Sequence, residues 1–269
     1  MKIDHLPQLI GIVNVSGDSF SEGSRSSSGD GAERALQLLA DGADIVEFGA
    51  ESTRPGAADI GLQEEMDRLF PVLEKFRQYG GCRFAVDTRR AETAAGALAL
   101  GAEYISDVSM GRFDENMFRT VAGTDAAIVI CHSRGTPQTM QQREFLEYSG
   151  DPVKAVIAEL QAAVQKAVCC GIKETNIIVD PGFGFSKTVP QLLELARRIG
   201  EFKVFGKVYV GVSRKSFIGM LTGREKAVDR IGGTLAVEMF LAAKGVDYIR
   251  THAPGALRDA LKMSMELSR

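Results

Sequence analysis

The chain has no excess of positive charge and no long apolar run, and both absences exclude classes of protein. Its 269 residues contain 32 Lys and Arg against 35 Asp and Glu, which gives a net charge of −3 and an isoelectric point of about 5.8. A general nucleic-acid binder needs a basic face. No stretch reaches the roughly 18 apolar residues of a membrane span, and the first residues lack the apolar core of a signal peptide. We therefore expect a cytoplasmic protein that binds neither nucleic acid nor membranes.

Cysteine is also scarce. The four cysteines form no CxxC pair and have no spacing typical of a zinc site, and Cys169 and Cys170 are adjacent. This pattern excludes a disulfide scaffold and is typical of reduced thiols in the cytoplasm. A chain of this length buries enough surface to fold without such cross-links.

The sequence does contain a regular alternation of short apolar runs and longer segments with helical periodicity. The apolar runs predict strands at 9–15, 45–49, 83–87, 104–108, 127–132, 176–180, 207–212 and 247–251. Helical spacing predicts helices at 32–40, 63–79, 92–100, 115–122, 152–170, 190–199, 229–244 and 254–267. Glycines at 42, 101, 171 and 245 stand where a left-handed residue commonly ends a helix before the next strand.

Eight strand–helix units predict an α/β fold, a (β/α)₈ TIM barrel, with residues 1–269 as a single domain. No linker and no break in composition divides the alternation. A doubly wound sheet shares this alternation, so the choice between the two folds depends on the residues that follow the strands.

Polar or charged residues follow every predicted strand, and in a barrel they all reach the same mouth. Asp87 and Asp180 end the third and sixth strands, and paired acids can accept hydrogen bonds from an amino-substituted nitrogen heterocycle. Lys215, after the seventh strand, can balance their charge and donate to a ring carbonyl. These residues predict a heterocycle site.

A second group of polar residues follows the first and eighth strands, which are neighbours in a closed barrel. Asn14 ends the first strand, and Arg250 and His252 end the eighth. An arginine, a histidine and an amide side by side predict an anion site, with phosphate as its ligand.

Two loops rich in small residues, at 13–21 and 49–57, follow the first two strands. We expect them to be mobile and to close over a bound ligand. Phe20 and Arg54 within them have no role in an ordinary surface loop. A glycine-rich run at 180–188 lacks the Gly-x-x-x-x-Gly-Lys-Ser/Thr register of a P-loop, so it indicates ATP binding only weakly.

Seven blocks of the sequence resemble the dihydropteroate synthases, folate-pathway enzymes built on a pterin-binding barrel. They occur in the family's order, at 11–15 with 18–21, 51–57, 86–88, 133–141, 180–185, 213–219 and 250–252. Ser-Thr-Arg-Pro-Gly at 52–56 and Ser-Arg-Lys-Ser at 213–216 are highly specific together. The resemblance implies a homodimer that uses Mg²⁺. Its implied reaction condenses 6-hydroxymethyl-7,8-dihydropterin diphosphate with p-aminobenzoate, giving 7,8-dihydropteroate and pyrophosphate.

The resemblance also implies roles for individual positions. It implies a pterin site formed by Asp87, Ser106, Asp180, Phe185 and Lys215. It implies a diphosphate site formed by Asn14, Thr53, Arg54, Arg250 and His252, with Asn14 also nearest the metal. It implies a p-aminobenzoate site formed by Phe20, Pro55, Phe185 and Ser216. The catalytic residues that it implies are Asp18, Arg54, Lys215 and Arg250.

The chain departs from the family pattern at two notable places. Ser16 and Gly17 stand where the family has Thr-Pro, and Ser106 stands where the family has an asparagine that contacts the pterin. Loss of one hydrogen bond costs about 0.5–1.5 kcal/mol. These changes motivate one alternative, a non-catalytic or weakly active pterin-binding paralogue. A second alternative, methyl transfer from a methylated folate to a corrinoid partner, fits the 52–56 loop and the anion site poorly.

Overall fold

The computed structural model describes residues 3, 5–15 and 28–268, and within them parallel strands close into a barrel. Neighbours in sequence pair along the sheet, and the first strand pairs with the last, with Gly11 opposite Thr251. The strands are β1 (Gln8–Asn14), β2 (Ile45–Gly49), β3 (Phe84–Asp87), β4 (Tyr104–Asp107), β5 (Ala127–Cys131), β6 (Ile177–Asp180), β7 (Lys207–Val210) and β8 (Tyr248–Thr251). The predicted TIM barrel is therefore confirmed, and the doubly wound sheet is excluded.

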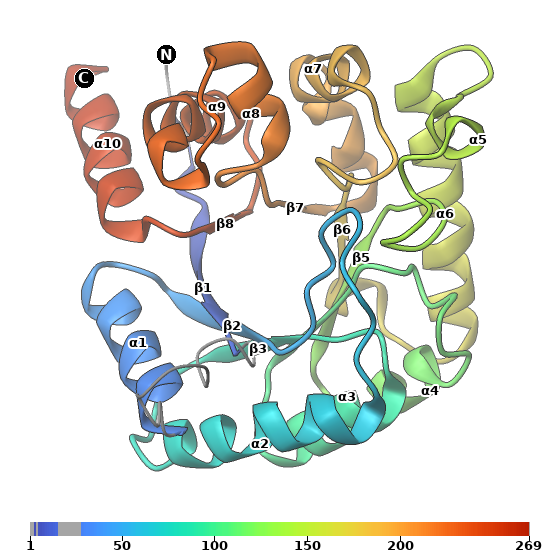
Figure 1. Cartoon of the computed structure of the whole chain (residues 1–269), viewed down its shortest axis with the longest axis vertical. Helices are drawn as coiled ribbons and strands as arrows, with labels where there is room; N and C mark the ends of the chain where they lie inside the picture. The colour runs from blue at the N-terminus through green and yellow to red at the C-terminus, as the bar shows by residue number, and fades with distance from the viewer. Residues whose placement is uncertain (1–2, 4, 16–27, 269) are drawn as a thin grey trace.

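The helices form a ring around the strands (Figure 1). They are α1 (Ser28–Ala40), α2 (Leu62–Arg77), α3 (Ala91–Ala99), α4 (Met117–Ala122), α5 (Arg143–Leu146), α6 (Pro152–Cys169), α7 (Val189–Arg197), α8 (Ser216–Thr222), α9 (Ile231–Ala243) and α10 (Pro254–Leu267). Short 3₁₀ turns cover Glu174–Asn176, Ile199–Phe205 and Ala227–Arg230. The sequence did not predict α5 and α8, which are too short to show a helical period.

The predicted glycine joints have the expected backbone. Gly42, Gly101, Gly171 and Gly245 have φ angles of +104°, +96°, +102° and +81°. Each lies two residues beyond the end of a helix, where the chain turns back toward the barrel. The repeated joint is one reason why the strand positions could be read from the sequence.

Two apolar cores hold the barrel together. Inside it, alternate strand residues form one cluster: Ile10, Ile45, Ala85, Tyr104, Val129, Ile178, Tyr209 and Tyr248. A larger cluster fills the space between the strands and the surrounding helices. In that outer core the rings of Phe48, Phe76 and Phe84 meet edge to face, with centroids 5.1–6.2 Å apart. They attach α2 to β2 and β3.

We predict that Phe76→Ala lowers the free energy of unfolding by about 3–5 kcal/mol, because it leaves a cavity against two strands. Tyr79→Ala is the control, since this nearby side chain is 45% exposed and its loss is expected to change stability by less than about 0.5 kcal/mol. Urea unfolding of both variants measures the difference, and equal effects would contradict this account of the core.

Candidate active site

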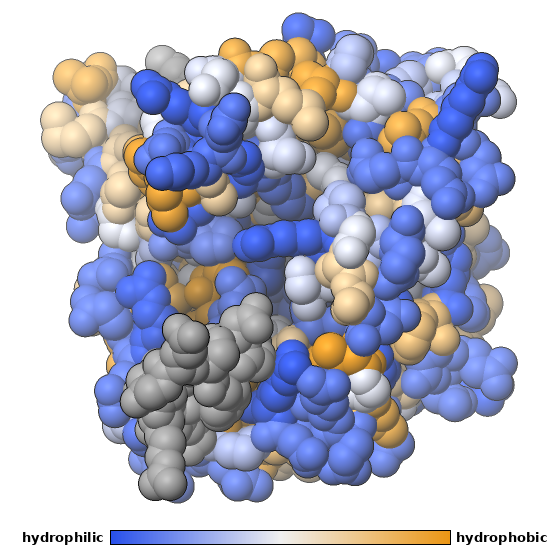
Figure 2. All heavy atoms as spheres, viewed as in Figure 1, coloured by the Kyte–Doolittle hydropathy of each residue, from blue (hydrophilic) through white to orange (hydrophobic). Residues whose placement is uncertain are grey.

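The inside of the barrel changes from apolar to polar toward the carboxyl ends of the strands. Because inward-facing residues alternate along a strand, the next inward position lies two residues beyond each member of the inner apolar cluster. On five strands that position is polar: Glu47, Asp87, Ser106, Asp180 and Arg250. These side chains form the floor of a polar site. Figure 2 shows a hollow near the centre of this face, with hydrophilic residues above it and hydrophobic atoms within.

Glu47 is the centre of this floor. It is 1% exposed, and its Oε2 accepts hydrogen bonds from Ser106 Oγ at 2.7 Å and from the Tyr209 hydroxyl at 2.9 Å. Its Oε1 forms an ion pair with Nε of Arg250. The Arg250 guanidinium also reaches Asp87, with Nη2 3.4 Å from Oδ2. One carboxylate therefore connects four strands and orients the arginine that lies above it.

The predicted heterocycle residues lie in environments that shift their proton affinities. Burial raises the pKa of Asp87 to about 7, against the lowering effect of Arg250. Burial also raises the pKa of Asp180, although the ammonium of Lys215 opposes this. Burial lowers the pKa of Lys215, with Asp180 acting in the other direction. Acids that keep a proton near neutral pH can donate to a ring nitrogen as well as accept from one.

Phe185 and Lys215 lie together beside these acids. The Lys215 ammonium lies 4.4 Å from the centre of the Phe185 ring and donates a hydrogen bond to the carbonyl of Phe183. Phe185 also lines a cavity of about 260 Å³ between the loops that follow β4 and β5, with Val108 and Ser133. The ring is half-buried, so it can pack against a flat ligand.

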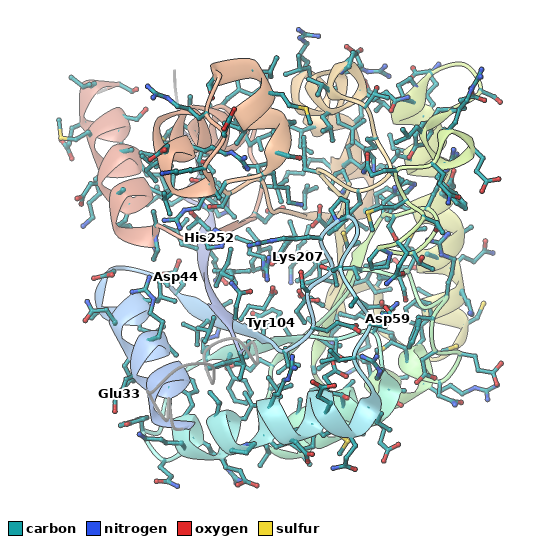
Figure 3. The ribbon with its side chains drawn as sticks, in the orientation of Figure 1. Glu33, Asp44, Asp59, Tyr104, Lys207 and His252 are labelled. Atoms are coloured by element: carbon teal, nitrogen blue, oxygen red, sulfur yellow. The ribbon has the colours of Figure 1, made fainter. Side chains whose placement is uncertain are left out.

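The predicted anion residues lie where β1 and β8 meet. Burial lowers the pKa of His252 to about 3, and the positive charges of Arg250, Arg214, Arg54 and Arg34 lower it further. A neutral histidine within reach of several arginines is typical of a site that binds an anion. Its Nδ1 lies 3.0 Å from the Ser213 hydroxyl, and Figure 3 shows His252 at the inner side of the ring, near the end of β8.

Two of these arginines, Arg214 and Arg34, were not among the site residues predicted from the sequence. Arg214 belongs to the Ser-Arg-Lys run after the seventh predicted strand, so a signal for it was present. Arg34 lies in α1, and nothing in its local sequence distinguishes it from an exposed helical arginine. Asn14, at the end of β1, is exposed.

The loop that follows β2 lies over the mouth and is held by ion pairs at its base. Glu51 accepts from Nε of Arg89 at 2.8 Å and from Nη1 of Arg90 at 3.2 Å. Farther along, the N–H of Gly56 donates to the carbonyl of Pro137 at 2.7 Å. In Figures 1 and 3 the loop, which carries Asp59, crosses toward β5 and β6.

The other predicted site residues belong to the second loop, the start of α8 and the first loop. The second loop brings Thr53, Arg54 and Pro55 to the mouth, where Arg54 and Pro55 are exposed. Ser216, at the start of α8, is also exposed. Asp18 and Phe20 lie outside the described residues, so their roles stay predictions. Among the described residues, no three His, Cys, Asp or Glu side chains converge on a possible metal ion.

A closed parallel barrel with its polar residues gathered at the carboxyl ends of the strands is the architecture of a TIM-barrel enzyme. Residues 10–252 match the family described as "Pterin binding enzyme". The chain belongs to this family.

Individual relatives are similar over nearly the whole chain. The dihydropteroate synthase of Synechocystis is 36% identical, over 97% of this chain and 90% of its own length. A folate synthesis bifunctional protein of Arabidopsis thaliana is 38% identical over 91% of this chain, which spans about half (53%) of that longer protein. The solved structure of Xanthomonas albilineans dihydropteroate synthase with 4-aminobenzoic acid has a TM-score of 0.90 at 32% identity, covering 100% of this chain and 95% of that one.

None of the described helices is both long enough and apolar enough to cross a membrane. The cytoplasmic location and the lack of a nucleic-acid partner stay predictions from the sequence.

One buried acid behind the site is not part of its floor. Glu238, on α9, has no exposed surface, and burial raises its pKa to about 8 against a smaller lowering by the hydroxyl of Thr251. Thr251 lies between Arg250 and His252. Among the described residues neither carboxyl oxygen of Glu238 has a hydrogen-bond partner, so its ionisation would leave a buried charge uncompensated behind the strand that carries both residues.

We predict that Glu238→Gln removes a pH dependence of folding. Between pH 4.5 and about 8, the folded protein keeps a proton on Glu238 that the unfolded chain has already released. The free energy of unfolding therefore falls as the pH rises through that range. The slope is at most about 1.4 kcal/mol per pH unit. Urea unfolding at several pH values measures it. Glu74→Gln, on the exposed side of α2, is the control, and an unchanged slope in Glu238→Gln would be inconsistent with a buried, protonated carboxyl.

Proposed function

We propose that this chain is a dihydropteroate synthase, which condenses 6-hydroxymethyl-7,8-dihydropterin diphosphate with p-aminobenzoate. The observation that carries the proposal is that half-buried Asp87 and buried Asp180, with Lys215, share one mouth with the arginine-surrounded His252. A pterin diphosphate needs such a pair of sites, one for the ring and one for the leaving group. The dihydropteroate synthase relatives support the same reaction.

In this proposal the floor of the barrel orients the pterin. Asp87 and Asp180 exchange hydrogen bonds with its amino-substituted edge, and Lys215 donates to the ring carbonyl. The hydroxyl of Ser106 donates to Glu47, so its lone pairs are what it can offer a ligand. Phe185, Pro55, Ser216 and Phe20 form the side on which p-aminobenzoate binds.

The reaction proceeds by a dissociative route. The C–O bond to the diphosphate breaks first, and electrons from the dihydropterin ring stabilise the cation left at the exocyclic methylene. Arg250, Arg54 and His252 take up the charge that develops on the diphosphate. The aniline nitrogen of p-aminobenzoate then forms the C–N bond and loses a proton, so the enzyme needs no nucleophile of its own.

The two loops complete the site. Closure of the loops after β1 and β2 excludes water, which would otherwise attack the cation. Asp18, on the first loop, lies near the cation in this proposal.

Asn14 is the residue that would hold a magnesium ion bound to the diphosphate of the substrate. Mg²⁺ commonly binds through substrate phosphates and water rather than through a cage of protein side chains. Asn14, an exposed amide at the end of β1, suits such an ion because it adds a single oxygen ligand. When bound, the ion offsets the negative charge of the leaving diphosphate.

A homodimer also belongs to the proposal. The exposed apolar side chains of the α8 region gather at one place in the sequence: Met220 and Leu221 on α8, and Val228 in the 3₁₀ turn that follows, are 72%, 55% and 62% exposed. Large exposed apolar residues that lie close together are typical of protein interfaces.

We predict that the purified protein releases pyrophosphate from the pterin diphosphate when Mg²⁺ and p-aminobenzoate are present, and that dihydropteroate forms with it. Release without condensation would place the defect in the loops or the p-aminobenzoate site. Pterin binding without release would favour the non-catalytic paralogue. Tighter binding of methyltetrahydrofolate than of the pterin diphosphate would favour methyl transfer.

Within the same assay, Arg54→Ala is expected to lower kcat by about 10²-fold, because it removes one donor to the developing charge. The side chain is exposed, so the variant should fold. Arg143→Ala removes an arginine that is also exposed, at 91%, and lies outside the site. Equal activity of the two variants would exclude this role for Arg54.

Sedimentation of the purified protein is expected to give twice the chain mass of 29.0 kDa. Leu221→Asp should shift the mass toward the monomer, since a charge would be buried at the interface. A wild-type monomer at micromolar concentration would refute the dimer proposal and leave the proposed reaction unaffected.

A further inference from the structure

The loop between β6 and α7 carries two parts of the site, and a second lysine holds it from within. Lys187 is 4% exposed. Its ammonium donates to the carbonyls of Gly182 and Phe185, each at 3.1 Å, and lies 2.9 Å from Nδ1 of His132. Lys215 takes the carbonyl of Phe183 between them. Two lysines therefore fix three carbonyls of one four-residue segment.

The imidazole of His132 is in the protonation state that accepts a hydrogen bond from the Lys187 ammonium. Burial, followed by the charge of Lys187, lowers its pKa to about 3, so the ring is neutral and carries one proton. Nε2 lies 3.1 Å from Oε2 of Glu159, which can only accept, so the proton belongs on Nε2. Nδ1 is then free to accept from Lys187.

The same chain of contacts continues to the loop backbone. Glu159 forms an ion pair with Arg134, and the N–H of Arg134 donates to Ser186 Oγ at 2.9 Å. The hydroxyl of Tyr148 donates to the Ser186 carbonyl at 3.1 Å. Ser186, the residue after Phe185, is thus bound to Arg134 in the segment after β5 and to Tyr148 between α5 and α6.

The loop backbone needs such restraint. Ser186 has a φ of +43°, a conformation that costs energy for a residue other than glycine. Gly182 has a φ of +73°, and a Cβ there would lie 1.8 Å from the carbonyl oxygen of His132. Only glycine fits this close approach, which places the Gly182 carbonyl within reach of Lys187.

We propose that Lys187 is a positioning residue of the active site, which through the carbonyls of Gly182 and Phe185 sets the place of the Phe185 ring and of the carbonyl that binds Lys215. This inference rests on the proposed function, because that function makes Phe185 and Lys215 substrate contacts. Lys187 itself touches no substrate in this account.

Its charge acts on the site as well. The titratable groups that face Lys187 are Cys131 at the end of β5, His132 directly after it, Asp180 on β6, Glu159 on α6 and Lys215 after β7. Burial lowers the pKa of Lys187 to about 7, so the side chain carries its positive charge below that pH, where it lowers the pKa of Asp180 against the larger effect of burial. Loss of the charge would therefore raise the pKa of Asp180 further and move the pH dependence of pterin binding to higher pH, with the largest difference from the wild type below about pH 7.

The test compares Lys187→Met, which removes the donors and the charge, with Lys187→Gln, which keeps two donors without the charge. Lys166→Met is the matched control, because Lys166 also donates to a loop carbonyl, that of Gly111 at 3.2 Å, but away from this loop. The probe is 6-hydroxymethylpterin, whose binding is followed by fluorescence between pH 5 and pH 9, values chosen to span roughly both sides of neutrality.

In Lys187→Met we expect pterin affinity to fall by about tenfold, which corresponds to about one unpaired buried hydrogen-bonding group. Lys187→Gln should recover part of the affinity but show the same pH shift, and Lys166→Met should match the wild type. Wild-type affinity and pH dependence in folded Lys187→Met would overturn the proposal. So would an equal loss in Lys166→Met.

Two readouts, pterin binding and hydrogen exchange, distinguish a failure of this inference from a failure of the proposed function. Pterin binding needs no condensation, so it reports on Lys187 even if the protein makes no dihydropteroate. If the wild type binds no pterin, the proposed function fails by itself, and hydrogen exchange of amides 182–187 then tests the inference. Faster exchange in Lys187→Met but not in Lys166→Met supports it, and unchanged exchange overturns it.

Discussion

The mouth of this barrel depends on one buried carboxylate. Glu47 projects into the barrel from β2, and its partners Ser106, Tyr209 and Arg250 come from β4, β7 and β8. A charge inside a protein is stable only when it is paired and hydrogen-bonded, so Glu47 and Arg250 require each other. Because Arg250 also reaches Asp87, the position of the first acid of the heterocycle site follows from the same pair.

This arrangement divides the mouth into two chemically different halves. On one side, Asp87 and Asp180 are acids that hold their protons unusually well, with Lys215 beside them. On the other, His252 is kept neutral by burial and by the surrounding arginines. Arg250 belongs to both halves, since it pairs with acids below and contributes positive charge to the anion side. A substrate with a polar ring joined to a diphosphate would span this division, with the reacting carbon at the boundary.

The loops above the floor are tied to it in different ways. Ion pairs at the base of the second loop hold Glu51 against Arg89 and Arg90. The loop after β6 is held instead by ammonium groups that bind backbone carbonyls, which leaves the Phe185 ring free to contact a ligand.

The hydrogen bond from Ser106 to Glu47 limits what Ser106 can offer a ligand. Its hydroxyl proton goes to Glu47, so the residue serves the floor as well as any ligand.

Much of the fold could be predicted from the sequence, because parallel strands buried on both faces appear as apolar runs between glycine joints and polar loops. The predicted strand 45–49 has the bounds observed for Ile45–Gly49, and the last predicted helix matches Pro254–Leu267. The short helix Ser216–Thr222 could not be predicted, since it has fewer than two full periods. The alternation of side chains also predicted that Asp87, Asp180 and Arg250 would face one mouth.

The sequence by itself therefore determined the barrel, the family and the strand ends at which the chemistry gathers. It contained a signal for Glu47 as well, an acid in the middle of an apolar strand, but not the identity of its partners. Glu47 and Tyr209 lie 162 positions apart, on strands that are not neighbours, and meet across the inside of the barrel. Arg34, an exposed residue of α1, adds a positive charge that acts on His252. Only the tertiary structure decided these pairings, because closure of the barrel turns side chains of distant strands toward one another. The proton affinities of buried groups then depend on which charges that closure places beside them.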